Sequence, residues 1–455
     1  MADSTKPAPQ SDQDLWKNLV IKLGGVLTQG QSPGADVKVY IPPFNSQGIP
    51  AGDLVDNKIT IFALFRVGDS LLPEDCPLYV PGTTSYIDRL NKYLDWVQLQ
   101  TNNDPGVQSV VDSRQKASQV ATDYYYTIYA KAKTIFDSMG PPPGQTLEVW
   151  AASNYPQLSG ARQSMESANQ TYLDALAIQM GPTAAQRGRD HRKLDLALMS
   201  TATENNMPTS SDPAPTTAST TPVGGLSFRP AYNIDSSYKG TIQAWIGTAL
   251  DPNKKPWTLE FDNKTTTQQD LTKTGFSSVN AQVNQDYWWF CSGSYKYGNE
   301  VKTERIDSTN ATDQITCVLE AQKASPFNLS PDSSWDLGQI QKDYTELKPG
   351  YPPELLKPMY RICTVLVGYN VKLKITMPKS LYDSVKDLYN KASSHGGSIR
   401  LLGFDIGGSG DVKNTSSTDF SKVTTNDQTF TFEIPASNNT YPVLLAALGQ
   451  RTGKD

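Results

Sequence analysis

The sequence predicts an α+β protein in which a helical hairpin or bundle arm separates a small N-terminal β region from a C-terminal antiparallel β-sandwich with one covering helix. Two periodicities support this prediction: apolar residues recur every three or four positions in the arm, and every second position after residue 279. The first spacing gathers side chains on one face of a helix, and the second on one face of a strand. We expect four parts: an N-terminal β-rich region (1–84), the helical arm (85–204), a Ser/Thr/Pro-rich linker (205–225) and the sandwich domain (226–455).

The N-terminal region is predicted to contain strands. Residues 37–41 alternate apolar and polar side chains before two prolines, which is typical of a strand. Residues 59–67 form a nearly continuous apolar run of strand length, so we expect a buried strand there. Residues 15–27 fit a short helix as well as a strand, and the polar residues 1–14 are expected to be disordered.

The arm contains helical repeats of unequal strength. The first covers residues 86–97, and a weaker fourth one covers residues 183–203. The second, residues 107–138, ends before a proline-rich breaker, because proline supplies no N–H and clashes with the preceding turn. Its expected apolar face consists of Val110, Ala117, Ala121, Tyr124, Ile128, Ala132 and Ile135. The expected seam of the third repeat, spaced strictly by three and four, consists of Leu158, Ala161, Met165, Ala168, Tyr172 and Ala175.

We interpret the second and third repeats as an antiparallel hairpin. Alanines on one seam leave room for Tyr or Met on the facing seam, and a narrow seam of this kind is typical of coiled-coil partners. Two roles remain open for the hairpin. It forms the core of a helical subdomain, or it projects as an arm that mediates assembly or undergoes a large movement.

Period-two patterns predict the C-terminal sheet. One run extends from Val279 to Tyr297 and a second covers residues 315–321, so we predict a long antiparallel hairpin over residues 279–321. Cys291 and Cys317 fall on its buried face, where we expect neighbouring free thiols rather than a disulfide. The remaining elements expected here are a third strand at 363–377, an amphipathic covering helix at 381–392 and later strands.

An aromatic cluster on this predicted hairpin is a candidate interaction site. Trp288 and Phe290 fall on its otherwise polar face, where they form an exposed apolar patch unless the arm or the linker covers them. Tyr295 and Tyr297 extend the cluster along the same strand. An exposed patch of this composition suits a carbohydrate platform, a membrane anchor or a contact between subunits.

Net charge and targeting signals limit the expected partners and the expected location of the protein. The chain has 41 Lys and Arg against 46 Asp and Glu, a net charge of −5, so we expect no nucleic acid partner. We interpret the local basic cluster of Arg187, Arg189 and Arg192 as a solvated helix face, with an anionic lipid or phosphate contact as the alternative. The sequence contains neither a signal-peptide pattern nor an apolar window of about 18 residues. We therefore expect a cytoplasmic protein, or one exported without a classical signal peptide.

Side chains suited to catalysis are sparse. The only histidines are His191 and His395, so few bases are available to activate a nucleophile. The four cysteines match no metal-ligand spacing. We therefore predict no catalytic residue, no cofactor and no metal site.

These observations favour a non-enzymatic protein that assembles with itself or interacts through the helical arm or the aromatic patch. The expected partner is a further copy of the chain, with membrane lipid or carbohydrate as alternatives. A second possibility is a toxin-like, membrane-active protein in which the 279–321 hairpin refolds to line a pore. An enzyme with an unmarked site is the third.

Overall fold

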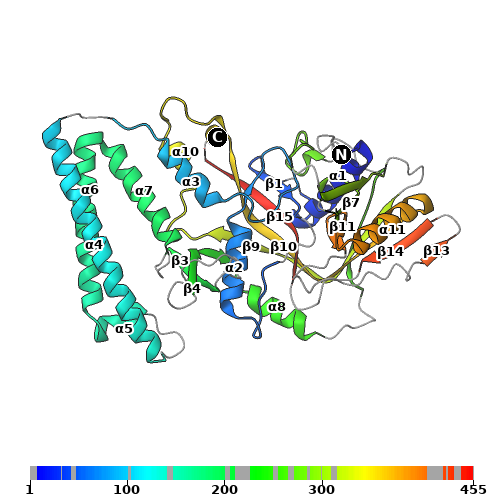
Figure 1. Cartoon of the computed structure of the whole chain (residues 1–455), viewed down its shortest axis with the longest axis horizontal. Coiled ribbons are helices and arrows are strands. Elements are labelled where there is room, and N and C mark those ends of the chain that lie inside the picture. The colour runs from blue at the N-terminus through cyan, green and yellow to red at the C-terminus, as the bar shows by residue number, and fades with distance from the viewer. Residues whose placement is uncertain are drawn as a thin grey trace. The chain divides into compact units, whose positions relative to one another are not determined.

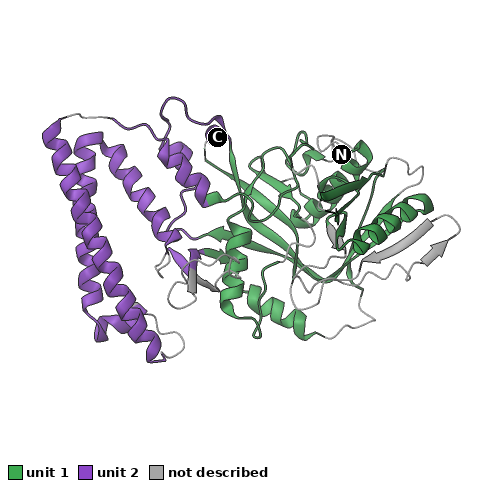
Figure 2. Cartoon of the chain, viewed as in Figure 1, with its two compact units in different colours: residues 1–86, 232–331, 358–455 green, residues 87–231, 332–357 purple. Residues whose placement is uncertain are grey.

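The structure is a computed structural model of the 455-residue chain (Figure 1). It describes residues 8–31, 33–42, 48–100, 104–140, 147–199, 205–210, 226–248, 255–264, 271–283, 287–298, 300–308, 315–406, 424–426, 429–434 and 442–453. The chain divides into two compact units (Figure 2). The sheet unit comprises Met1–Tyr86, Tyr232–Pro331 and Pro358–Asp455, and the helical unit comprises Ile87–Ala231 and Asp332–Lys357.

The helical unit is organised around two long helices, α4 (Pro105–Ser138) and α6 (Gln157–Met180). Near one end of the pair Gln179 donates to Gln108, and further along Ser118 donates to Asn169, so the helices run antiparallel. The hairpin predicted from the sequence is therefore confirmed. The other described elements of this unit are α3 (Tyr86–Asp95, within the unit from Ile87), α5 (Leu147–Asn154), α7 (Pro182–Leu198), β3 (Asn206–Ser210), β4 (Leu226–Pro230), α10 (Ile340–Asp343) and the short helix Pro353–Leu356.

The face of α4 that packs in the hairpin differs from the predicted one. Ile128 and Ala132 are buried as expected, but Val110, Tyr124 and Ile135 are exposed. The buried positions are instead Val111, Ser118, Thr122, Tyr125, Ile128, Tyr129, Ala132 and Phe136. Helix α4 thus packs along a stripe displaced by about 100°, the angle between successive residues of a helix.

The sheet unit contains two antiparallel sheets, described here over the residues that the structure places. In the larger sheet, β10 (Met359–Pro378) pairs with β9, β14, β15 and β2. The other strands of this sheet are β1 (Val37–Tyr40), β2 (Leu71–Leu72), β5 (Tyr232–Ile234), β6 (Trp257–Asp262), β9 (Thr316–Pro331), β13 (Thr424–Asn426), β14 (Thr429–Ile434) and β15 (Val443–Thr452). The smaller sheet has the order β12 (Phe404–Ile406), β11 (Ser398–Leu401), β7 (Cys291–Tyr297) and β8 (Glu300–Ile306).

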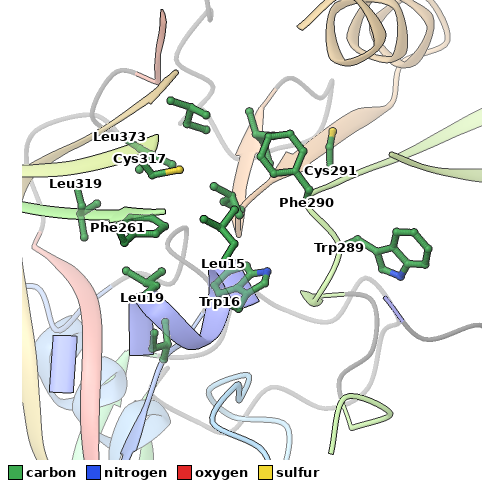
Figure 3. Close-up of a cluster of buried hydrophobic side chains, with 14 of the residues drawn as sticks. Leu15, Trp16, Leu19, Phe261, Trp289, Phe290, Cys291, Cys317, Leu319 and Leu373 are labelled. Carbon is green, nitrogen blue, oxygen red and sulfur yellow. The ribbon is translucent and has the colours of Figure 1, made fainter. Parts of the chain in front are cut away.

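Helices α11 (Lys379–Ser394) and α1 (Gln10–Leu27) contribute side chains to a large hydrophobic core of the sheet unit. The predicted covering helix is α11, and the second, α1, comes from the N-terminus. Figure 3 shows three side chains of α1 beside three from β6 and β9: Leu15, Trp16, Leu19, Phe261, Cys317 and Leu319. Two shorter helices, α2 (Asn57–Gly68) and α8 (Tyr238–Gly247), belong to the same unit. The predicted α+β class, with antiparallel sheets and a long helical region, is confirmed.

The N-terminal predictions were only partly correct. Residues 37–40 form the expected strand β1, but the apolar run at 59–67 lies in helix α2 rather than in a strand. The Asp56 side chain accepts from the Lys58 N–H and caps this helix, which a strand would not require. Residues 10–14 belong to α1 instead of being disordered, while residues 1–7 lie outside the described part of the chain.

The predicted hairpin over residues 279–321 is wrong. Residues 279–283 and 287–290 do not form strand. The first strand of this region starts at Cys291, and it pairs with β8 and β11. The second run, β9, pairs with β6 and β10 in the other sheet. Cys291 and Cys317 consequently lie in different sheets, and both are buried free thiols. The pore-forming alternative loses the element on which it was based.

Strand β10 confirms the third predicted run. Alternate residues from Val371 to Met377 are buried, as period-two spacing requires. Cys363 is only half-buried, because the pairing with β15 shifts register between Ile362 and Thr364 and so interrupts the alternation. Of the predicted linker, residues 205–210 are placed and form β3 from Asn206 on, and residues 211–225 lie outside the described part of the chain. Among the described helices, none combines the length and the apolar character needed to cross a bilayer.

Candidate functional site

The predicted aromatic patch is not a surface feature. Trp288 and Phe290 are both completely buried, within the core of the sheet unit. The Trp288 indole donates to the Val283 carbonyl at 3.1 Å, and the Phe290 N–H donates to the Asp12 carboxylate at 2.8 Å. The chain turns here instead of extending as a strand. The alternating side-chain directions of a strand therefore do not decide which of these residues face water. Trp288 and Phe290 therefore offer no exposed platform for carbohydrate, lipid or another subunit.

Tyr295 and Tyr297 are brought together around His395. Their ring centroids lie 5.7 and 5.4 Å from the imidazole, with Tyr295 stacked on it and Tyr297 at its edge. Tyr295 is buried and donates to Glu304, which also pairs with Lys391. Tyr297 is 57% exposed. The polar groups of Tyr295, Glu304 and Lys391 bond to one another, and we assign no ligand to this cluster.

The three predicted arginines separate on helix α7. Arg189 is exposed and donates to Gln186 on its own helix at 3.0 and 3.2 Å. Arg187 and Arg192 instead line a pocket within the helical unit. Residues 187 and 189 point about 200° apart on a helix, so they cannot form one continuous basic face.

This pocket has a volume of about 430 Å³ and is bounded by α4, α6 and α7. Apolar walls come from the second half of α6, where Leu173, Leu176 and Met180 face the space. Polar groups come from all three helices. They are Ser118, Gln119, Thr122, Asn169, Tyr172, Arg187, His191, Arg192 and Asp195.

Gly188 sets the distance between α6 and α7 beside the pocket. A Cβ at this position would lie 2.6 Å from Cδ2 of Leu173, which is closer than real Cβ atoms approach a neighbour. A larger residue would require Leu173 to move or α6 and α7 to separate. A glycine inside a helix lowers the intrinsic stability of that helix, whereas here Gly188 permits the helix packing that shapes the pocket.

The pocket is electrostatically mixed. Burial lowers the pKa of His191, and the nearby Arg187 lowers it further, so the imidazole is neutral at pH 7. Its Nε2 lies 3.6 Å from the Asp95 carboxylate. Burial raises the pKa of the Asp195 carboxyl, while His191 and Arg192 lower it by a smaller amount. The residue as a whole is exposed. Burial also raises the pKa of Tyr172, which Arg187 opposes.

Several of these groups have unused hydrogen-bonding capacity. The buried Nε of Arg187 and Nε2 of His191 have no hydrogen-bond partner among the described residues. Arg192 directs Nη2 at the Met165 sulfur, 3.3 Å away, and a thioether is a weak acceptor. Ser118 donates to Asn169 instead of to His191, so the described contacts form no nucleophile–base pair. The unused donors of the two arginines suit the binding of an anion.

Sequence reasoning found the arginines but missed their neighbours. Arg187, His191 and Asp195 are spaced by four residues, so one face of a helix carries all three. That spacing was available in the sequence. Tyr172 and Asn169 were not identifiable, because they join the pocket only through the packing of α6 on α7.

A second feature of the helical unit is an exposed apolar face on α4. Val110, Val120 and Tyr124 are 52%, 65% and 54% exposed. An open groove of about 580 Å³ follows this face and is lined by Ser113, Lys116, Ala117, Val120, Ala121 and Tyr124. We call these six residues and Val110 the α4 face.

No protein-family model matches the chain, and no curated protein and no solved structure matches it.

Proposed function

We propose that this chain is a non-enzymatic self-assembling protein in which α4 pairs with α4 of a second copy. The observation that carries the proposal is the uneven use of the two faces of α4. The helix packs on α6 with polar Ser118 and Thr122 among its buried positions, while Val110, Val120 and Tyr124 remain exposed. Contiguous exposed apolar surface of this kind marks interaction sites.

Spacing along the α4 face supports a second copy as the occupant. In a two-fold antiparallel pairing centred on Val120, Ala117 of one chain lies within one residue of the level of Tyr124 of the other. A small residue facing a large one allows two helices to interdigitate, and two-fold pairs use the same patch on both subunits.

Charges beside the face agree with the same pairing. Lys116, at the edge of the α4 face, and Asp123 lie on the same flank of α4. The two-fold arrangement brings Lys116 of each chain next to Asp123 of the other. In a parallel two-fold pair, the same flanks of the two helices lie on opposite sides of the seam, so Lys116 and Asp123 do not meet. The flanking charges therefore favour the antiparallel arrangement.

The test is the molar mass in solution, measured by size-exclusion chromatography with light scattering. The wild type should elute at twice the 49.9 kDa monomer mass, and Val120→Asp should elute as a monomer, because the pairing would bury two carboxylates at its centre. Val301→Asp is the matched control, since Val301 on β8 is 66% exposed and lies outside the α4 face.

A charge exchange tests the orientation of the pair. Lys116→Asp alone should weaken the dimer, and the double variant Lys116→Asp/Asp123→Lys should restore it. A monomeric wild type at micromolar concentration, or a Val120→Asp variant that dimerises like the wild type, would refute the proposal.

A further inference from the structure

We propose that the pocket between α4, α6 and α7 binds a small carboxylic acid with an apolar tail. The inference is independent of self-assembly, because no residue of the α4 face lines this pocket. Its volume of about 430 Å³ lies in the range of small-molecule sites, which are mostly apolar and contain a few polar groups.

The arginines identify the charged end of the ligand. A guanidinium presents a planar set of donors that matches a carboxylate, and Arg187 has a buried Nε without a partner in the described residues. Arg192 supplies a second guanidinium, whose contact with the Met165 sulfur leaves it available for a better acceptor. His191 adds another buried nitrogen without a hydrogen-bond partner among the described residues. An anion bound here would satisfy donors that the protein itself leaves unsatisfied.

The acidic groups limit the charge of that anion. Asp195 lines the pocket with the two arginines, and Asp95 lies 3.6 Å from His191. Together with Asp195, a ligand with one negative charge neutralises the two arginines. A phosphate dianion would carry excess negative charge and would be repelled by both carboxylates. These charges favour a monocarboxylate over a phosphate.

The apolar wall identifies the rest of the ligand. Leu173, Leu176 and Met180 line the part of the pocket contributed by the second half of α6, and Leu99 and Ala184 extend that surface. Removing an alkyl chain from water against these side chains is favourable in proportion to the area buried. The combination of an arginine pair and an aliphatic wall therefore suits a short fatty acid.

Isothermal titration of the full-length protein with octanoate tests the inference. The wild type should bind octanoate, and octan-1-ol should bind at least about tenfold more weakly, because it lacks the charge that the arginines recognise. Inorganic phosphate should not compete. Equal binding of the acid and the alcohol, competition by phosphate, or no heat of binding for octanoate would each overturn the proposal.

Two arginines on the same helix provide matched variants. Arg187→Met should weaken octanoate binding by about tenfold or more, while Arg189→Met should leave it within about twofold, because Arg189 is exposed and outside the pocket. Equal effects of the two substitutions would contradict the assignment. Should Arg187→Met fail to fold, Leu176→Trp fills the apolar part without removing a charge. That variant must also lose binding, and retained binding would refute the site.

Discussion

The buried carboxylate of Asp12 makes the stability of the sheet unit depend on pH. Asp12 lies on α1 and accepts from the N–H groups of Phe290 and Ser308, both at 2.8 Å, and from the Ser308 hydroxyl. Burial raises its pKa from 3.8 to about 6, although the three hydrogen bonds lower it. In this way one side chain links the N-terminal helix to two segments nearly 300 residues away.

The sign of the effect follows from the direction of the pKa shift. The folded state binds the proton of Asp12 more tightly than the unfolded state does. The stabilisation that protonated Asp12 gives the folded state is therefore fully present below about pH 4, and it is lost as the pH rises through 6. The difference between the two pKa values corresponds to about 3 kcal/mol of unfolding free energy. The wild type should therefore lose roughly 2 kcal/mol from this group between pH 4 and pH 7.

Urea denaturation at half-unit steps from pH 4 to pH 7 measures this contribution. Asp12→Asn should remove the fall in stability between pH 4 and pH 7, because the amide does not titrate in this range. Asp14→Asn, on the same helix, should keep the pH profile of the wild type. An Asp12→Asn profile parallel to that of the wild type would refute the reasoning.

Two further predictions concern packing, and both are measured by urea denaturation at constant pH. Gly188→Ala should destabilise by about 1–3 kcal/mol, because the new methyl group overlaps Leu173, while Gly160→Ala on α6, with open space around it, should stabilise by about 0.5–1 kcal/mol. A Gly188→Ala protein as stable as the wild type would show that α6 and α7 can separate at little cost. Leu319→Ala, at a fully buried position on β9, should destabilise by about 2–5 kcal/mol, and the exposed Leu356→Ala should change stability by less than about 0.5 kcal/mol. Similar losses for both leucine variants would contradict the central place of β9 in the core.

The sequence by itself determined those helices and strands in which the spacing of apolar residues defines a single buried face. Leu158, Ala161, Met165 and Ala175 are buried on α6 as their spacing predicted, and alternate residues of β10 are buried from Val371 to Met377. In each case the apolar residues follow one period. Burying that face requires only that some partner covers it.

Tertiary structure decided the cases in which two patterns compete or in which a partner must be chosen. Helix α4 carries two stripes about 100° apart, and contact with α6 buries the one that contains Ser118 and Thr122. Before Cys291, the Phe290 N–H bonds to Asp12 on α1, and the alternating sequence therefore turns instead of continuing as a strand. The pocket likewise exists only where three helices meet. Local periodicity reports which side chains share a face, but the identity of the covering element depends on residues far away in the chain.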